Sequence, residues 1–133
     1  MPTRGAVLAD LHVELVAADR SVWSGEATMV IARTTSGDIG IMPSHEPLLG
    51  VLESGPVTIR TTDESGPVVA AVQGGFISFS DNQLSILAEV AELADEIDVA
   101  RAERALERSR SEADAAAQRR AEVRLAAAAA GSR

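Results

Sequence analysis

The sequence predicts a β plus α protein, in which an N-terminal antiparallel β-sandwich or barrel precedes a C-terminal helical segment. Up to about residue 90, short apolar or alternating segments are separated at regular intervals by turn residues, as is typical of sandwiches and barrels. Beyond that point the chain is dense in Ala, Glu and Arg and has no Gly or Pro before Gly131. We therefore divide it into a β domain, 1–90, and a helical arm, 91–133.

The β domain contains several segments with the composition of strands. In "LHVELVA" at 11–17, apolar and polar residues alternate, so Leu11, Val13 and Leu15 should share one face. The other predicted strands are 27–34, 56–62, 67–72, 75–80 and 83–89. Turn signals such as "SGD", "DESGP" and "SDNQ" separate them, which favours antiparallel neighbours.

The arm is longer than the usual globular helix, so we expect a break in it. The best candidate is "SRSEAD" at 109–114, where Ser109 or Ser111 could cap a second helix. That gives a helical hairpin ending at Gly131, a residue suited to a C-terminal cap, with one long helix as the alternative. Large apolar residues are scarce, and Ala buries little area, so the helices should form readily but dock weakly. Such an arm is either a moving part or a static hairpin.

Composition excludes several classes of function. The net charge of −8 divides into −11 for residues 1–100 and +3 for residues 101–133. An acidic body disfavours nucleic acid, whereas the basic tail suits an acidic protein partner or nucleotide phosphates. The absence of cysteine rules out disulfides and thiolate metal sites. No apolar run approaches the ~20 residues of a membrane span, and the polar Asp10, His12 and Glu14 argue against a signal peptide at the N-terminus.

The residue types needed for catalysis are sparse. His12 and His45 are the only imidazoles, and a metal site would require both to converge with Glu14 or Glu46. His12 should instead point to solvent, because it alternates with Leu11 and Val13. No turn marks a serine nucleophile for His45 to activate. We therefore predict neither a catalytic site nor a metal site.

The stretch "SGDIGIMPSHEPLLG" at 36–50 points to a known family. Its G-x-x-P-x-H-x-P pattern, Gly40, Pro43, His45 and Pro47, stands upstream of the pair Gly74–Gly75 in "VQGGFISF". Together with "LHVELVAADRSVWSGEA" and the Ala/Glu/Arg tail, this order resembles the ε subunit of bacterial F-type ATP synthase over residues 8–110, and the Arg/Ala bias resembles actinobacterial members. The resemblance implies a flattened sandwich of about ten strands followed by two helices.

The resemblance also implies partners and a place in the cell. It implies a non-catalytic subunit of the central stalk that contacts the γ subunit, the c ring and the α/β catalytic hexamer and couples proton flow to ATP synthesis. Such a subunit lies at the cytoplasmic face of the cell membrane without inserting into it. The helical arm of the family restrains ATP hydrolysis, and an arginine-rich arm suits an acidic segment of the β subunits. The positions matching family interfaces are Ala17, His45 and Gly50 for γ, and Gly37, Asp38 and Ile39 for the c ring.

A nucleotide-binding motif of some family members, I-D-x-x-R-A, is also matched. Ile97, Asp98, Arg101 and Ala102 occupy it, and Glu92 stands six positions before the aspartate. The resemblance implies weak ATP binding with no cofactor required, and a free-standing ATP-sensing module is the alternative function. The competing explanation is a helix N-cap, in which Asp98 accepts hydrogen bonds from the first turn. The tail "LAAAAAGSR" lacks the large apolar and basic residues of longer family members, so inhibition by the arm is less firmly implied than coupling.

Overall fold

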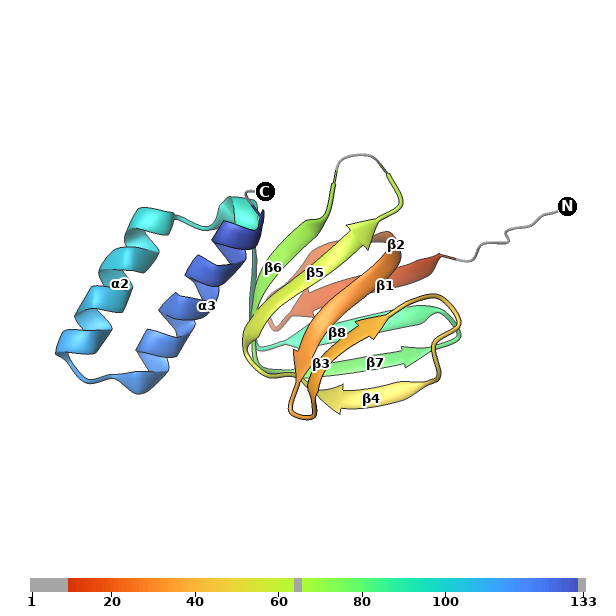
Figure 1. The fold of residues 1–133 in the computed structure, drawn as a ribbon, viewed down its shortest axis with the longest axis horizontal. Coiled ribbons are helices and arrows are strands. Elements are labelled where there is room, and N and C mark those ends of the chain that lie inside the picture. The colour runs from red at the N-terminus through yellow and green to blue at the C-terminus, as the bar shows by residue number, and fades with distance from the viewer. Residues whose placement is uncertain (1–9, 64–65, 132–133) are drawn as a thin grey trace, which may run out of the picture.

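The computed structural model describes residues 10–63 and 66–131. A nine-stranded sheet folds into a sandwich, and a two-helix arm stands at one side of it (Figure 1). The predicted order of β domain and helical hairpin is therefore confirmed. The segment 1–9, which was considered for a leader, and part of the turn predicted at 63–67 lie outside the described residues.

The sheet has one continuous path of hydrogen-bonded neighbours, β4-β7-β8-β1-β2-β5-β6-β9, with β3 paired to β2. Its strands are β1 Leu11–Ala17, β2 Arg20–Thr34, β3 Gly37–Ile41, β4 Leu48–Val51, β5 Gly55–Thr61, β6 Val68–Gln73, β7 Phe76–Ser80, β8 Gln83–Ala88 and β9 Val90–Leu93.

Strand β2 turns this path into two layers. It is 15 residues long; its first half pairs with β1, and its second half pairs with β5 and β3. Irregularities in its pairing let the strand bend between the layers. Leu11, Val13 and Leu15 share one face as predicted, and each has no exposed surface in the core that both layers enclose.

The structure corrects the strand predictions in two respects. Strand β1 pairs with β8 in parallel, whereas every other strand pair is antiparallel among the described residues. Strands β3 and β4 and the first half of β2 were not predicted. These segments contain Gly or Ser, which have low strand propensity, and β4 directly follows Pro47. Pairing with neighbouring strands therefore decides their conformation.

The arm contains the predicted break. Helix α2 spans Val99–Ser111 and helix α3 spans Ala115–Gly131. The capping prediction is wrong: Ala117 N donates to Asp114 Oδ1 at 3.0 Å. The hydroxyls of Ser109 and Ser111 instead donate to carbonyls three residues back, within α2.

Residues 91–97 are not α-helical, although their composition favours an α-helix. Val90–Leu93 form β9, which pairs antiparallel with β6, and Ala94–Glu96 form a single 3-10 turn, η1. Hydrogen bonding to the edge of β6 outweighs the helix propensity of Ala and Glu. The first α-helix of the arm therefore begins at Val99.

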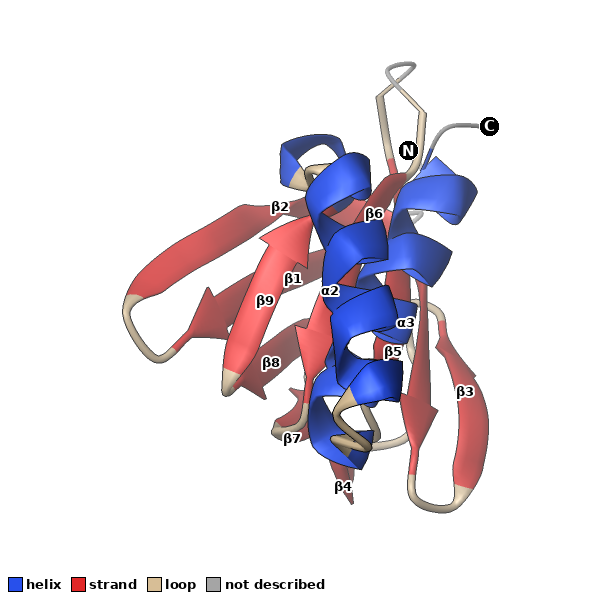
Figure 2. Cartoon of the chain, turned by 90° about the vertical axis from the view of Figure 1, so that its left-hand side faces the viewer, coloured by secondary structure: helices blue, strands red, loops and turns tan. Residues whose placement is uncertain are grey.

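Helix α3 docks the arm onto the sheet, and α2 packs on the far side of α3 (Figures 1 and 2). Val123 and Ala127 of α3 meet Val69 and Ala71 of β6 in a small apolar cluster. The side-chain amide of Gln73 donates to the carbonyl of Arg120 at 3.3 Å. These side chains are small, in keeping with the predicted weak docking. Neither described α-helix is long and apolar enough to cross a membrane.

Candidate functional site

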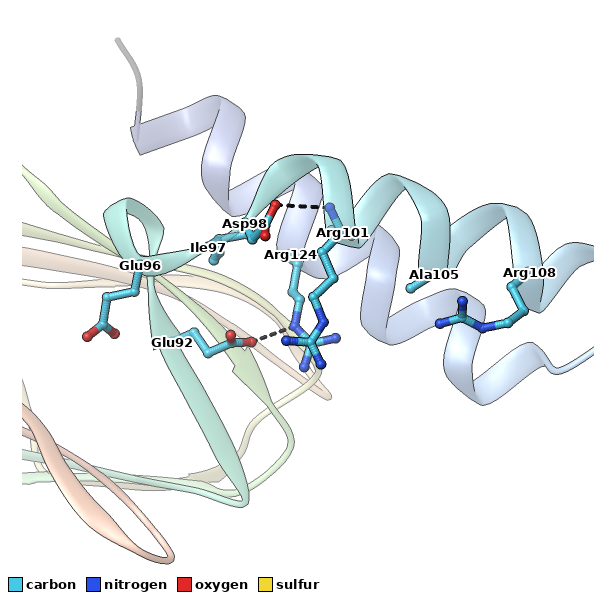
Figure 3. A pocket seen from close by; sticks show the side chains of 9 residues that line it. Glu92, Glu96, Ile97, Asp98, Arg101, Ala105, Arg108 and Arg124 are labelled. Atoms are coloured by element: carbon cyan, nitrogen blue, oxygen red, sulfur yellow. Dashed lines mark hydrogen bonds and ion pairs between the residues drawn. The ribbon is translucent and has the colours of Figure 1, made fainter.

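A polar pocket of about 430 Å³ lies where the arm meets the sandwich. Strand β9, the turn η1, both helices and the link between η1 and α2 contribute to it (Figure 3). Its lining residues are Glu92, Glu96, Ile97, Asp98, Arg101, Ala102, Ala105, Arg108 and Arg124. The structure therefore brings together all five residues predicted for a nucleotide.

The start of α2 positions the motif residues. Asp98 has extended backbone angles, and its Oδ1 accepts a hydrogen bond from Arg101 N at 3.0 Å, so it is the N-cap of α2. Arg101, Ala105 and Arg108 follow at helical spacing and line the same side of the helix. The N-cap explanation is thus confirmed for Asp98, and it coexists with a pocket that the same helix lines.

Strand β9 supplies Glu92, which is paired across the pocket. Arg124 Nε of α3 donates to Glu92 Oε1 at 2.5 Å, and the two side chains point toward each other in Figure 3. Arg124 was not among the predicted site residues. It lies 32 positions from Glu92, so only the fold of the arm brings the pair together.

A second ion pair fixes the turn beside the pocket. Arg20 Nη2 lies 3.1 Å from Glu96 Oε1, and Leu93 N donates to the same oxygen at 3.1 Å. The Arg20 guanidinium, followed by the Leu93 amide, holds the pKa of Glu96 below its ordinary value. Glu96 is therefore an ion-paired carboxylate engaged by the sandwich at the edge of the pocket, and its side chain points away from Arg101 and Arg124 (Figure 3).

The remaining positive charge of the pocket is available to a ligand. Among the described residues, Arg101 and Arg108 form no ion pair within 4.0 Å. Guanidinium groups without a carboxylate partner suit phosphate oxygens, which they can contact through two parallel N–H bonds. Arg108 was missed from the sequence, although it stands two helical turns after Arg101.

The residues predicted for the c ring lie at the β2–β3 hairpin. Gly37 has a φ of 116°, a left-handed value that favours glycine. Asp38 follows it with 67% of its side chain exposed and pairs with Arg33 Nε at 3.0 Å. Ile39 is half-buried against the core. The hairpin thus offers one exposed carboxylate that is held by a neighbouring strand.

The residues predicted for γ differ in exposure. His45 is half-buried, its ring Nδ1 donates to Glu46 O at 2.7 Å, and the ring lies edge-on to Phe79. Gly50 is half-buried in β4, and a side chain there would contact Ile77. Ala17 is 6% exposed and belongs to the core. Of the three residues predicted for γ, only His45 has a side chain that is partly exposed on this chain.

The sandwich exposes a stripe of apolar side chains that was not predicted as a site. Val51 of β4, Phe76 of β7 and Leu87 of β8 lie directly opposite one another in register, across three neighbouring strands. They are 48%, 56% and 54% exposed. Val16 of β1 is the register partner of Leu87 and extends the row. We call these four residues the apolar stripe. Contiguous exposed apolar surface of this kind marks interaction sites.

The two histidines do not converge. His12 lies on β1 and contacts Glu14 and Glu26, whereas His45 lies in the segment between β3 and β4. Within residues 10–63 and 66–131, no group of three or more histidine or acidic side chains is arranged to hold a metal ion.

Comparison with known proteins gives a consistent result. A family described as "ATP synthase, Delta/Epsilon chain, beta-sandwich domain" matches residues 10–94. The chain is 80% identical over 117 residues to the ATP synthase epsilon chain of Streptomyces griseus subsp. griseus, covering 88% of this chain and 94% of that protein. It is 51% identical over 120 residues to the ATP synthase epsilon chain of Thermobifida fusca, covering 89% and 88%.

Solved structures show the same fold. A chain in the cryo-EM structure of the Euglena gracilis mitochondrial ATP synthase, OSCP/F1/c-ring in rotational state 1, superimposes with a TM-score of 0.70 at 22% identity, covering 93% of this chain and 81% of that chain. A chain of the Tetrahymena thermophila mitochondrial ATP synthase central stalk/c-ring has a TM-score of 0.55 at 23% identity, covering 66% and 69%. The first similarity extends over both the sandwich and the arm.

Proposed function

The chain belongs to the family of ATP synthase epsilon chains, and from this premise we propose that it acts in the central stalk, where it binds the γ subunit, rests on the c ring and couples proton flow to ATP synthesis. The apolar stripe carries this proposal. Val51, Phe76 and Leu87 form an exposed row across three neighbouring strands, and a stable partner would cover it. His45 supports the same assignment, because it is only half-buried and its ring contacts Phe79 near the end of β7.

Replacing Phe76 by Asp is expected to abolish co-purification with the γ subunit. Phe76 is 56% exposed, so the folded chain tolerates a polar residue there, whereas the interface would lose a buried ring worth roughly 1.5–3 kcal/mol and gain an unpaired charge. We expect γ affinity to fall at least about tenfold. Val99→Asp is the matched control, since Val99 is exposed on the arm rather than on the apolar stripe. If the wild-type chain fails to retain γ, the stalk assignment is wrong.

For the β2–β3 hairpin we propose a contact with the c ring. Asp38 is exposed and oriented by Arg33, so it presents a fixed negative charge to polar loops of the c ring. We propose that the chain lies at the cytoplasmic face of the cell membrane, within the complex and outside the bilayer. We propose no catalytic centre for the chain itself, and the chemistry of ATP synthesis then belongs to the α/β hexamer.

We further propose that the pocket between β9 and the arm binds ATP weakly. The support is the convergence of Glu92, Asp98 and Arg101 with Arg108 and Arg124 around a single cavity. Arg101 and Arg108 would hold phosphates, and a carboxylate would hold ribose or the adenine amine. A nucleotide there would contact sandwich, α2 and α3 together and thus favour the docked arm, which makes nucleotide level a signal for arm position. A free-standing ATP sensor is the second candidate function, favoured by this pocket alone.

Arg101→Gln is expected to remove MgATP binding. The substitution keeps the start of α2, because the N-cap bond uses the backbone N of residue 101, but removes a guanidinium that no carboxylate occupies. Loss of a charge-assisted contact of about 1.5–3 kcal/mol should weaken binding more than tenfold in calorimetric titrations of the purified chain. Arg104→Gln, on α2 but outside the pocket lining, is the control and should bind as the wild type does. Equal binding by both variants would place the nucleotide elsewhere.

We also propose that the arm restrains ATP hydrolysis by leaving the sandwich and extending toward the catalytic hexamer. Two observations support a movable arm. The buried members of its apolar cluster with the sheet are all Val or Ala, and α2 packs on α3 rather than on the sandwich. Two states separated by a few kcal/mol can exchange in response to a partner.

A further inference from the structure

His12 lies between two glutamates on the outer face of β1 and β2. Its Nδ1 is 2.7 Å from Glu26 Oε2, and its Nε2 is 2.6 Å from Glu14 Oε2. Glu26 is directly opposite His12 in the antiparallel register, and Glu14 is two residues farther along β1 on the same face. A neutral imidazole carries one N–H and one lone pair, so it can donate to only one of these oxygens. Both contacts together require an additional proton.

We propose that His12, Glu14 and Glu26 form a proton-binding centre that joins β1 to β2 and holds its proton at neutral pH. The ligand of this centre is a single proton, shared along the two short N···O contacts. The centre is separate from the nucleotide pocket, and it does not depend on the proposed place of the chain in the stalk.

The proton belongs to the imidazole ring rather than to a carboxyl group. Ser24, the register partner of Glu14, donates its hydroxyl to Glu14 Oε2 at 2.5 Å, so that oxygen accepts from both Ser24 and His12. An oxygen that accepts two donors is stabilised as a carboxylate. The hydrogen bonds to Glu26 and then Glu14 raise the pKa of His12, and those from Ser24 and then His12 lower the pKa of Glu14. The raised pKa of His12 and the lowered pKa of Glu14 both agree with a protonated ring that donates to two carboxylates.

Among the described residues, the outward-facing register neighbours of His12 carry no positive charge. On β8 these neighbours are Gln83, opposite His12, and Ser85, opposite Glu14, and both are neutral. Asp10 precedes His12 by two residues, and Asp81 lies in the turn whose Asn82 carbonyl accepts His12 N at 2.8 Å. The groups that raise the pKa of His12 are Glu26 and then Glu14. The two glutamates contact opposite nitrogens of one ring, so they cannot chelate one metal ion together with it.

The centre makes the sandwich sensitive to rising pH. A group whose pKa is raised by folding stabilises the folded chain fully below its ordinary value, here 6.5, and that contribution disappears as pH rises through the raised pKa. Loss of the proton leaves a lone pair facing a carboxylate and changes the charge of the centre from −1 to −2. The change occurs on the sheet face that also carries Leu87, so the proton sets the charge at one end of that surface.

Imidazole 15N NMR of the full chain across pH 5 to 10 tests the proposal, with His45→Gln used to assign the signals. We expect His12 to show two protonated nitrogens at pH 7 and to titrate later than a histidine in the urea-unfolded chain. Glu26→Gln should lower the titration midpoint of His12, because an amide replaces the carboxylate. Asp10→Asn is the matched control: it removes one charge from the same face without removing a hydrogen bond, and should shift the midpoint less.

A neutral His12 tautomer at pH 7, or equal shifts in the Glu26→Gln and Asp10→Asn variants, would overturn the proposal. Urea unfolding at each pH supplies an independent measurement. The stability difference between wild type and His12→Gln should be constant at low pH and should shrink as pH rises through the midpoint found by NMR. A difference that does not vary with pH would also contradict a proton-binding centre, whether or not the chain binds γ.

Discussion

Gly75→Ala is expected to unfold the sandwich, whereas Gly37→Ala should leave it folded. Gly75 has a φ of 119° and joins β6 to β7, where the chain passes from one layer to the other. A Cβ at this position would lie 2.0 Å from the carbonyl oxygen of Leu87 and 2.8 Å from Ala88 Cα. Both atoms belong to the backbone of a core strand, so neither can move aside. We expect a loss of roughly 3–5 kcal/mol, from left-handed strain together with overpacking.

Gly37 is the matched control for this prediction. Its φ of 116° is nearly that of Gly75, but a Cβ there would meet no heavy atom within 4 Å. Gly37→Ala should therefore show the cost of the backbone conformation alone, about 1–2 kcal/mol. Urea unfolding followed by circular dichroism measures both variants. Equal losses of stability in the two variants would mean that the backbone of β8 moves away from a Cβ at residue 75 without cost. The close contact between Gly75 and β8 would then not be a rigid feature of the fold.

The β domain was predictable where alternation and turns coincide. In β1 every second side chain is buried, so the period of two alone identifies Leu11, Val13 and Leu15 as core residues. The same period cannot identify β4, because Leu49 and Val51 point outward there. An apolar residue on the surface carries the same signal as one in the core. That is also why the apolar stripe was invisible before the strands were placed in register.

The helical arm shows a different limit. Asp98 was identifiable as a helix cap and Arg101 as its neighbour, because both properties depend on contacts within one turn. Strand β9 could not be identified in this way, because its conformation depends on pairing with the edge of β6, about twenty residues earlier in the sequence. Arg124 was missed for the same reason. The family motif thus identified the residues at the start of α2 together with Glu92, whereas Arg108 and Arg124 became visible only once the helices were placed beside β9.

Removal of residues 98–133 is expected to raise ATP hydrolysis by the assembled enzyme, and a disulfide that fixes the docked arm should have the same effect. The chain has no cysteine of its own, so an introduced pair is unambiguous within it. A Cβ at Gly131 would lie 3.7 Å from Val69 Cβ, a separation that suits a disulfide, but 2.5 Å from Ala94 Cβ. Val69→Cys and Gly131→Cys combined with Ala94→Gly therefore place two thiols in reach and remove the clash.

The oxidised triple variant tests movement of the arm rather than its presence. If the arm restrains hydrolysis by leaving the sandwich, the truncated and the oxidised enzymes should hydrolyse MgATP at the same raised rate, about 2- to 10-fold above wild type, and reductant should restore the lower rate only in the latter. The variant with Val69→Cys and Ala94→Gly but an intact Gly131 controls for weakened packing at β6. Unchanged hydrolysis in both enzymes would show that the arm is no inhibitor. A raised rate after truncation alone would mean that the arm restrains hydrolysis from its docked position, where α3 holds it against β5 and β6.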